Sequence, residues 1–154
     1  MIIAFPPCTY LTNAAACRLY PTKGNLDQER YEKGLKAKEF FMIFYNADCE
    51  KIAIENPISS KVFNMPKHTQ EIQPYEYGHP FTKKTRLWLK GLPKLKPTNI
   101  ITEDVTSWVN AGSKDNKGNR RKHLGVTHYS LTRSKTFTGI AKAMAEQWGD
   151  VKSQ

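Results

Sequence analysis

Two short apolar runs, each closed by proline, constrain the fold of this chain most. Residues 2–5 read Ile-Ile-Ala-Phe and stop at Pro6 and Pro7. Residues 51–57 read Lys-Ile-Ala-Ile-Glu-Asn-Pro, so the second run ends in a polar pair and a proline. Continuous apolar runs of this length are typical of strands buried on both faces, as in parallel sheets. Both runs therefore predict buried strands with ends fixed by proline.

Helical patterns lie between and after these runs. A helix is predicted from about Asn25, with Gln28 at capping-box spacing, to about Asn46, although Gly34 weakens it. Its second half contains Phe-Phe-Met-Ile-Phe at 40–44, which is apolar nearly all round and therefore predicts burial.

The rest of the pattern completes an α/β fold. Residues 86–90 alternate as a strand, residues 99–105 predict another, and residues 138–148 predict a helix stopped by Gly149. Strands that alternate with helices in this way predict a mostly parallel sheet with flanking helices. The ligands of such sheets lie outside the carboxyl ends of the strands, where Cys8 and Glu55 are expected.

Length and composition favour one intracellular domain. A chain of 154 residues is about the size of one domain, so we expect a single domain over 1–154. No stretch approaches the ~20 apolar residues of a membrane span, and the N-terminus does not resemble a secretory signal. Three cysteines, an odd number, argue against a disulfide framework.

The positive charge is one-sided. Residues 1–50 carry six bases and six acids, so the net charge of +10 comes entirely from the rest of the chain. Two irregular basic segments, at about 64–86 and 111–123, predict a nucleic-acid surface. Its candidate residues are Lys83, Lys84, Lys114, Lys117, Arg120, Arg121 and Lys122. The alternatives are a solubilising charge and a disordered loop.

Cys8 and Glu55 are the candidates for chemistry. A thiol after Pro-Pro at a strand end is a candidate nucleophile, and its alternative role is that of a small buried hydrophobe, which we assign to Cys17 and Cys49. A carboxylate at the end of an apolar strand suggests proton sharing with a substrate nitrogen, or else a salt bridge with a lysine. Asn56 is expected to hydrogen-bond a loop backbone. The four histidines form no metal pattern, and no phosphate-binding glycine motif occurs.

Pro6-Pro7-Cys8-Thr9 followed by Glu55-Asn56-Pro57 resembles the catalytic Pro-Cys and Glu-Asn-Val motifs of cytosine carbon-5 DNA methyltransferases. The chain is more closely similar to small phage and prophage proteins that resemble these enzymes. The similar stretches, which cover most of the chain, are 3–12, 53–57, 72–75, 82–93 and 139–149.

The resemblance implies a truncated Rossmann-like methyltransferase layer. It implies that the Cys8 thiolate adds to carbon 6 of a flipped cytosine and that Glu55 binds ring nitrogen 3, before carbon 5 takes the methyl group of S-adenosylmethionine. It further implies that the substrate is bound by Pro7, Thr9, Asn56 and Arg86. The glycine-rich segment that binds S-adenosylmethionine in the family has no equivalent here.

Two function classes follow. The first is a DNA cytosine-5 methyltransferase-like enzyme, and the second is a catalytically inactive nucleic-acid-binding or phage accessory or anti-defence protein derived from that fold. A small-molecule nucleotide binder is a weaker third, because no phosphate cradle is present. Since a sheet without its first strands exposes a strand edge, we expect a partner chain or a homodimer to cover it. The expected location is the cytoplasm, which for a phage protein is that of the host.

Overall fold

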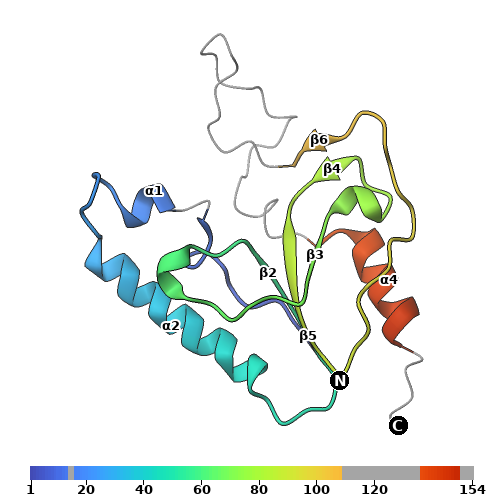
Figure 1. Ribbon diagram of the computed structural model, residues 1–154, viewed down its shortest axis with the longest axis horizontal. Coiled ribbons are helices and arrows are strands. Elements are labelled where there is room, and N and C mark those ends of the chain that lie inside the picture. The colour runs from blue at the N-terminus through green and yellow to red at the C-terminus, as the bar shows by residue number, and fades with distance from the viewer. Residues whose placement is uncertain (14–15, 109–135, 150–154) are drawn as a thin grey trace. The chain divides into compact units, whose positions relative to one another are not determined.

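The computed structural model describes residues 1–13, 16–108 and 136–149, which form a mixed α/β structure (Figure 1). These residues group into two compact units. The first comprises residues 1–72, without 14–15, and residues 84–94; the second comprises 73–83, 95–108 and 136–149. The candidate nucleophile Cys8 and the candidate carboxylate Glu55 both belong to the first unit.

The first unit is built on a four-stranded sheet of order β1-β2-β5-β3. Its strands are β1 (Ile2–Ala4), β2 (Ile52–Pro57), β3 (Gln70–Ile72) and β5 (Thr85–Lys90). The three strands predicted from residues 2–5, 51–57 and 86–90 are thereby confirmed, but the expected burial of the first was wrong, because Ile3 and Phe5 are exposed at the outer edge of the sheet.

The sheet is mixed, so the expectation of a mostly parallel sheet was wrong for the described strands. β1 and β2 are parallel, whereas β5 is antiparallel to both β2 and β3. Parallel neighbours need a long crossover connection, which α2 (Gln28–Tyr45) supplies only between β1 and β2. β3 and β5 have no α-helix between them, and they pair antiparallel.

Helix α2 packs one face on the sheet (Figure 1). Its Phe41 is fully buried and lies in one cluster with Ile54 and Trp88. Phe40 and Ile43 are exposed, so the expected burial on all sides was wrong, because only one face of the helix meets the strands. The helix begins at Gln28 rather than near Asn25, since the Asp27 side chain accepts the Arg30 N–H at 2.9 Å and caps it.

A second cluster packs beside the first turns of α2. It joins Leu11, Leu19 of helix α1 (Ala16–Leu19) and Phe63 of the 3₁₀ helix at Lys61–Phe63. Phe63 lies directly against Gly34, where a Cβ atom would collide with its ring. Gly34 therefore allows the close approach of these two segments, which accounts for a glycine inside a long helix.

The second unit contains helix α4 (Thr138–Trp148), whose bounds and stop at Gly149 agree with the prediction. Two short parallel strands, β4 (Phe81–Thr82) and β6 (Thr106–Ser107), and a 3₁₀ helix at Pro74–Glu76 complete its described part.

The strand predicted over 99–105 is absent. Asp104 adopts a left-handed φ of 51°, and the Ile101 N–H bonds to the Tyr75 carbonyl rather than to a strand partner. Among the described helices, none has the length and apolar character needed to cross a membrane.

Candidate functional site

The carboxyl ends of β1 and β2 meet at one edge of the sheet. Their register pairs Ala4 with Ile54, so the next residue of each strand brings Phe5 level with Glu55. Cys8 follows three residues later. β1 and β2 are adjacent and parallel, so Cys8 follows β1 at the end of the sheet toward which Glu55 lies in β2.

Asn56 fastens these two strand ends to each other. Its side chain is 1 % exposed, and its amide donates a hydrogen bond of 3.2 Å to the Pro6 carbonyl. This contact confirms the predicted bond from Asn56 to a loop backbone. Because it acts on the residue before Pro7, it fixes the start of the turn that carries Cys8.

The turn after Cys8 is closed and anchored. The Cys8 carbonyl accepts the N–H groups of Leu11 at 3.0 Å and Thr12 at 2.9 Å, and Leu11 in turn accepts the Ser60 N–H at 2.7 Å. Pro7 and Thr9 are exposed, and Cys8 is only partly buried.

The other two cysteines differ from each other. Cys49 packs against the cluster around Phe41, as expected of a small hydrophobe. Cys17 is exposed, so the expectation that it is buried was wrong.

Arg30 contacts the same turn, although no local sequence pattern indicates this contact. From the first turn of α2, its Nη2 donates to the Thr9 carbonyl at 3.1 Å, and its guanidinium carbon lies 5.0 Å from the centre of the Tyr10 ring. The contact spans 21 positions in sequence, so no local spacing could predict it. Arg30 thus attaches the Cys8 turn to helix α2 through the Thr9 carbonyl.

Glu55 is partly buried within β2, and its Oε2 is shielded from solvent. Successive side chains of a strand point to opposite faces. Ile54 packs toward α2, so Asn56 shares that face and Glu55 occupies the other, level with Leu87 of β5. The carboxylate therefore lies on the sheet face opposite α2.

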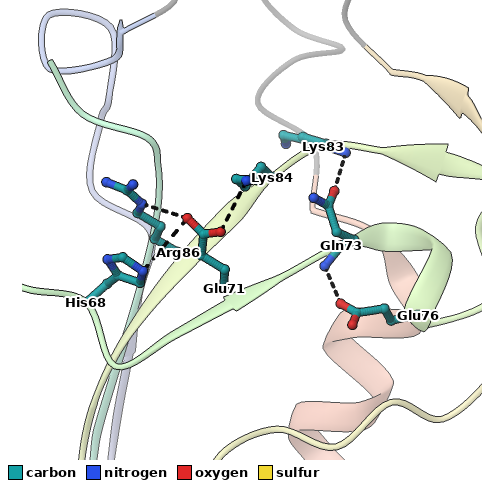
Figure 2. A network of polar contacts seen from close by, with 7 residues as sticks. All are labelled: His68, Glu71, Gln73, Glu76, Lys83, Lys84 and Arg86. Carbon is teal, nitrogen blue, oxygen red and sulfur yellow. Dashed lines mark hydrogen bonds and ion pairs between the residues drawn. The ribbon is translucent and has the colours of Figure 1, made fainter.

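Arg86 lies on a different face from Glu55. It pairs with Asn56 across β2 and β5 and with Glu71 across β5 and β3, so the three share the α2 face. Its Nε donates to Glu71 Oε2 at 3.2 Å, as Figure 2 shows. The structure therefore brings the Arg86 backbone beside the candidate site and directs its side chain to Glu71.

Glu71 gathers two further basic groups. Lys84 Nζ lies 3.3 Å from Glu71 Oε1, and His68 Nε2 lies 3.8 Å from Oε2 (Figure 2). Burial alone would raise the pKa of Glu71, but the hydrogen bonds and charges of Arg86 and Lys84 outweigh it and lower the pKa. Burial, followed by the charge of Arg86, lowers the pKa of His68.

Lys83 belongs to the second unit, separate from Lys84. Its N–H donates to Gln73 Oε1 at 3.0 Å, as drawn in Figure 2, and its Nζ lies 5.6 Å from the centre of the Phe137 ring. Phe137 also packs against Trp108 with ring centres 5.0 Å apart. The other candidate nucleic-acid residues lie outside the described residues: Lys114, Lys117, Arg120, Arg121 and Lys122.

The described residues do not fit S-adenosylmethionine. In the methyltransferases that the sequence resembles, the cofactor segment is rich in glycine and follows a strand, whereas β1 is followed by Pro6 and Pro7 and β2 ends at Pro57. The described glycines of the first unit are Gly24, Gly34 and Gly91, and Gly34 is filled by the Phe63 ring. A hollow of about 570 Å³ on α2, lined by Leu35, Lys38, Glu39, Met42, Ile43 and Asn46, includes neither Cys8 nor Glu55.

The part of the chain that the structure describes holds no group of three or more His, Cys, Asp or Glu residues that could bind a metal ion. No protein-family model, curated protein or solved structure matches the chain.

Proposed function

We propose that the edge formed by the carboxyl ends of β1 and β2 is the base-binding site of a DNA cytosine-5 methyltransferase-like protein. The observation that carries the proposal is the Asn56 hydrogen bond to Pro6, which fastens the Cys8 turn to the end of the strand that carries Glu55. A thiol and a carboxylate on adjacent strand ends are the two groups that addition to a cytosine ring requires.

The proposed reaction of these two residues is a reversible addition. The Cys8 thiolate forms a bond to carbon 6 of cytosine, and the electron pair of the carbon 5–carbon 6 double bond shifts to carbon 5 while protonated Glu55 donates a hydrogen bond or its proton to ring nitrogen 3. Carbon 5 takes a proton from water and then loses the other hydrogen as a proton to water. The double bond re-forms as the thiolate leaves, and nitrogen 3 returns any proton to Glu55. The net result without any other reactant is exchange of the carbon 5 hydrogen.

In the cytosine-5 methyltransferases that the sequence resembles, S-adenosylmethionine supplies a methyl group to carbon 5. Because the described residues do not fit this cofactor, the proposal for this chain stops at addition to the base. The β1–α2–β2 crossover nevertheless supports a Rossmann-like layer, since many doubly wound sheets also carry an antiparallel strand. A DNA substrate implies an intracellular location.

Hydrogen exchange at carbon 5 tests the proposal without a methyl donor. The protein is incubated with an oligonucleotide that contains 5-tritiated cytosine, and the tritium released to water is counted. We expect release from the wild-type protein and from Cys17→Ser, and none from Cys8→Ser. Equal release from the Cys8→Ser and wild-type proteins, or no release from either at saturating oligonucleotide, would refute the proposed addition.

The second candidate function is nucleic-acid binding without chemistry. It is favoured by the excess of basic residues, all of which lies after residue 50. It predicts binding that weakens steeply with salt and that Cys8→Ser leaves intact. Binding of this kind, together with no tritium release, would favour this function over the first.

A partner on the outer edge of β1 is also part of the proposal. No described strand pairs with that edge, and Ile3 and Phe5 are 39 % and 51 % exposed. Natural proteins normally cover or charge such an edge. Light scattering should give the mass of a dimer for the wild-type protein and of a monomer for Ile3→Lys; a monomer in both would contradict self-association.

A further inference from the structure

We propose that Arg30 is a positioning residue for Cys8, because its guanidinium binds the carbonyl of the next residue, Thr9, and so places a positive charge on the turn that carries the thiol. Its role in catalysis rests on the proposed function. Its effect on the reactivity of the thiol does not, and can be measured by itself.

Two side chains hold the backbone before and after Cys8. Asn56 binds the carbonyl two residues before it, and Arg30 binds the carbonyl of Thr9, one residue after it, at 3.1 Å. Neither contact is between neighbours in sequence. Both contacts add to the backbone hydrogen bonds that the Cys8 carbonyl accepts from Leu11 and Thr12.

The Arg30 side chain is itself fixed. Its guanidinium carbon lies 5.0 Å from the centre of the Tyr10 ring, a distance at which a cation is attracted to an aromatic face. Its backbone N–H is bound by the Asp27 carboxylate at 2.9 Å, which sets the helix turn from which the side chain extends. The positive charge therefore has a defined place near the turn.

The Arg30 guanidinium has one N–H group that makes no hydrogen bond to the described residues. Its Nε is buried and has no hydrogen-bond partner among the described residues. A buried N–H of this kind is rare and is often explained by a water, an ion or a functional role. An anion that enters the site, such as a thiolate or a phosphate of the bound nucleotide, is a suitable acceptor.

Other charged groups lie around Arg30. The Asp27 carboxylate caps the same helix turn, and Lys33 pairs with Glu29 and interacts with Asp27 and Tyr10. Glu55 belongs to the sheet face opposite α2. Carboxylates oppose the effect of Arg30 on a thiolate, and the Lys33 ammonium adds to it. A positive charge near a thiol stabilises its thiolate form and lowers the pKa of the thiol.

The test measures the alkylation of Cys8 as a function of pH. The parent protein carries Cys17→Ser and Cys49→Ser, because Cys17 is exposed and hydrogen bonding to the Lys51 backbone lowers the pKa of Cys49. The rate of reaction with iodoacetamide then reports the thiolate of Cys8 alone. Arg30→Met removes the charge and the clamp, Arg30→Gln keeps an N–H donor for the Thr9 carbonyl, and Arg30→Lys keeps the charge.

We expect the midpoint of the pH profile to rise by about half to one pH unit in Arg30→Gln and Arg30→Met and to stay near that of the parent in Arg30→Lys. Lys36→Met, which removes an exposed charge from the same helix, is the matched control and should leave the midpoint unchanged. A purely structural role would alter the thermal melt without this separation of charged from neutral variants.

Superimposable profiles for the parent and a folded Arg30→Gln would overturn the proposal, and if Arg30→Met fails to fold, Arg30→Gln decides. The alkylation result is independent of tritium release. A shifted pH profile without hydrogen exchange at cytosine would refute the proposed function and leave the role of Arg30 in place. Exchange at cytosine with an unshifted pH profile would support the proposed function and refute the role of Arg30.

Discussion

The side-chain amide of Asn56 donates a hydrogen bond of 3.2 Å to the backbone carbonyl of Pro6. It is a buried contact between the end of one parallel strand and the segment that leaves its neighbour. Parallel strands hold each other only along their paired length, and β1 is three residues long. The Asn56 contact extends the attachment past the last strand residue, so that the turn containing Cys8 starts from a fixed point.

Asn56→Ala should therefore lower the free energy of unfolding by about 1–3 kcal/mol, because it leaves the Pro6 carbonyl without its partner in a site closed to water. Urea unfolding followed by tryptophan fluorescence measures the change. Asn25→Ala, which truncates an exposed asparagine, is the control and should change stability by less than about 0.5 kcal/mol. Equal effects of the two substitutions would contradict this role for Asn56.

Gly34→Ala should destabilise the protein, although alanine is the better helix former by about 1 kcal/mol. A Cβ atom at this position meets the ring of the buried Phe63, and overpacking of this kind costs about 1–3 kcal/mol. The double substitution Gly34→Ala with Phe63→Leu should recover part of the loss. Chemical denaturation of the wild type, the two single variants and the double variant gives the coupling free energy between the two positions. Additive effects would show that the two residues do not interact.

Structural features that depend on neighbouring residues in the chain could be predicted from the sequence. The strand ends at Pro6 and Pro57 and the helix stop at Gly149 are of this kind, and each lies within a residue or two of the expected place. The strand Gln70–Ile72 has no such signal, because three residues with one buried side chain show no periodicity. Its position depends on β5.

The candidate site shows the same division. The adjacency of the strands that carry Glu55 and lead to Cys8 follows from β1 and β2 being parallel neighbours, as the apolar runs predict. The direction of Arg86 depends on register, since a shift of one residue between strands exchanges their two faces. The contact of Arg30 depends on how α2 is placed over the sheet, which local sequence does not encode.

Acidification should weaken the first unit through Glu71. Its carboxyl has a lowered pKa in the folded protein, so the unfolded chain binds the proton more readily. The stabilisation is complete above the unfolded pKa, near pH 4.5, and is lost as the pH falls through the lower folded value. Because the Glu71 side chain is about one third exposed, Glu71→Gln should lower the free energy of unfolding by only about 0.5–1 kcal/mol at pH 7.

Unfolding measured from pH 7 to pH 3 should show a smaller acid-dependent loss in Glu71→Gln than in the wild-type protein. Glu29→Gln removes an exposed carboxylate from α2 and is the control, whose profile should follow that of the wild type. His68 acts in the same direction at higher pH, since its folded pKa is lowered from 6.5 and protonation favours the unfolded chain. Parallel profiles for Glu71→Gln and the wild type would contradict this account.

His79 caps helix α4 in the second unit. Its Nε2 accepts the N–H of Gly139 at 3.0 Å and lies 3.5 Å from the hydroxyl of Thr138, whereas the residue at the cap position, Phe137, has no side-chain acceptor. His79→Ala should lower stability by about 0.5–2 kcal/mol, the usual cost of a lost helix cap. His79→Asn, whose shorter side chain still offers an acceptor, should lose less.

Hydrogen exchange at the Gly139 amide separates the cap from general packing of the His79 ring against Phe137. Loss of the acceptor should speed exchange at this amide more than in the middle of α4, because the first turn of a helix depends on acceptors from outside the helix. His79→Phe keeps a ring of similar shape without the acceptor, so it should exchange as fast as His79→Ala. Protection of Gly139 in His79→Phe would mean that packing, and not the hydrogen bond, holds the start of α4.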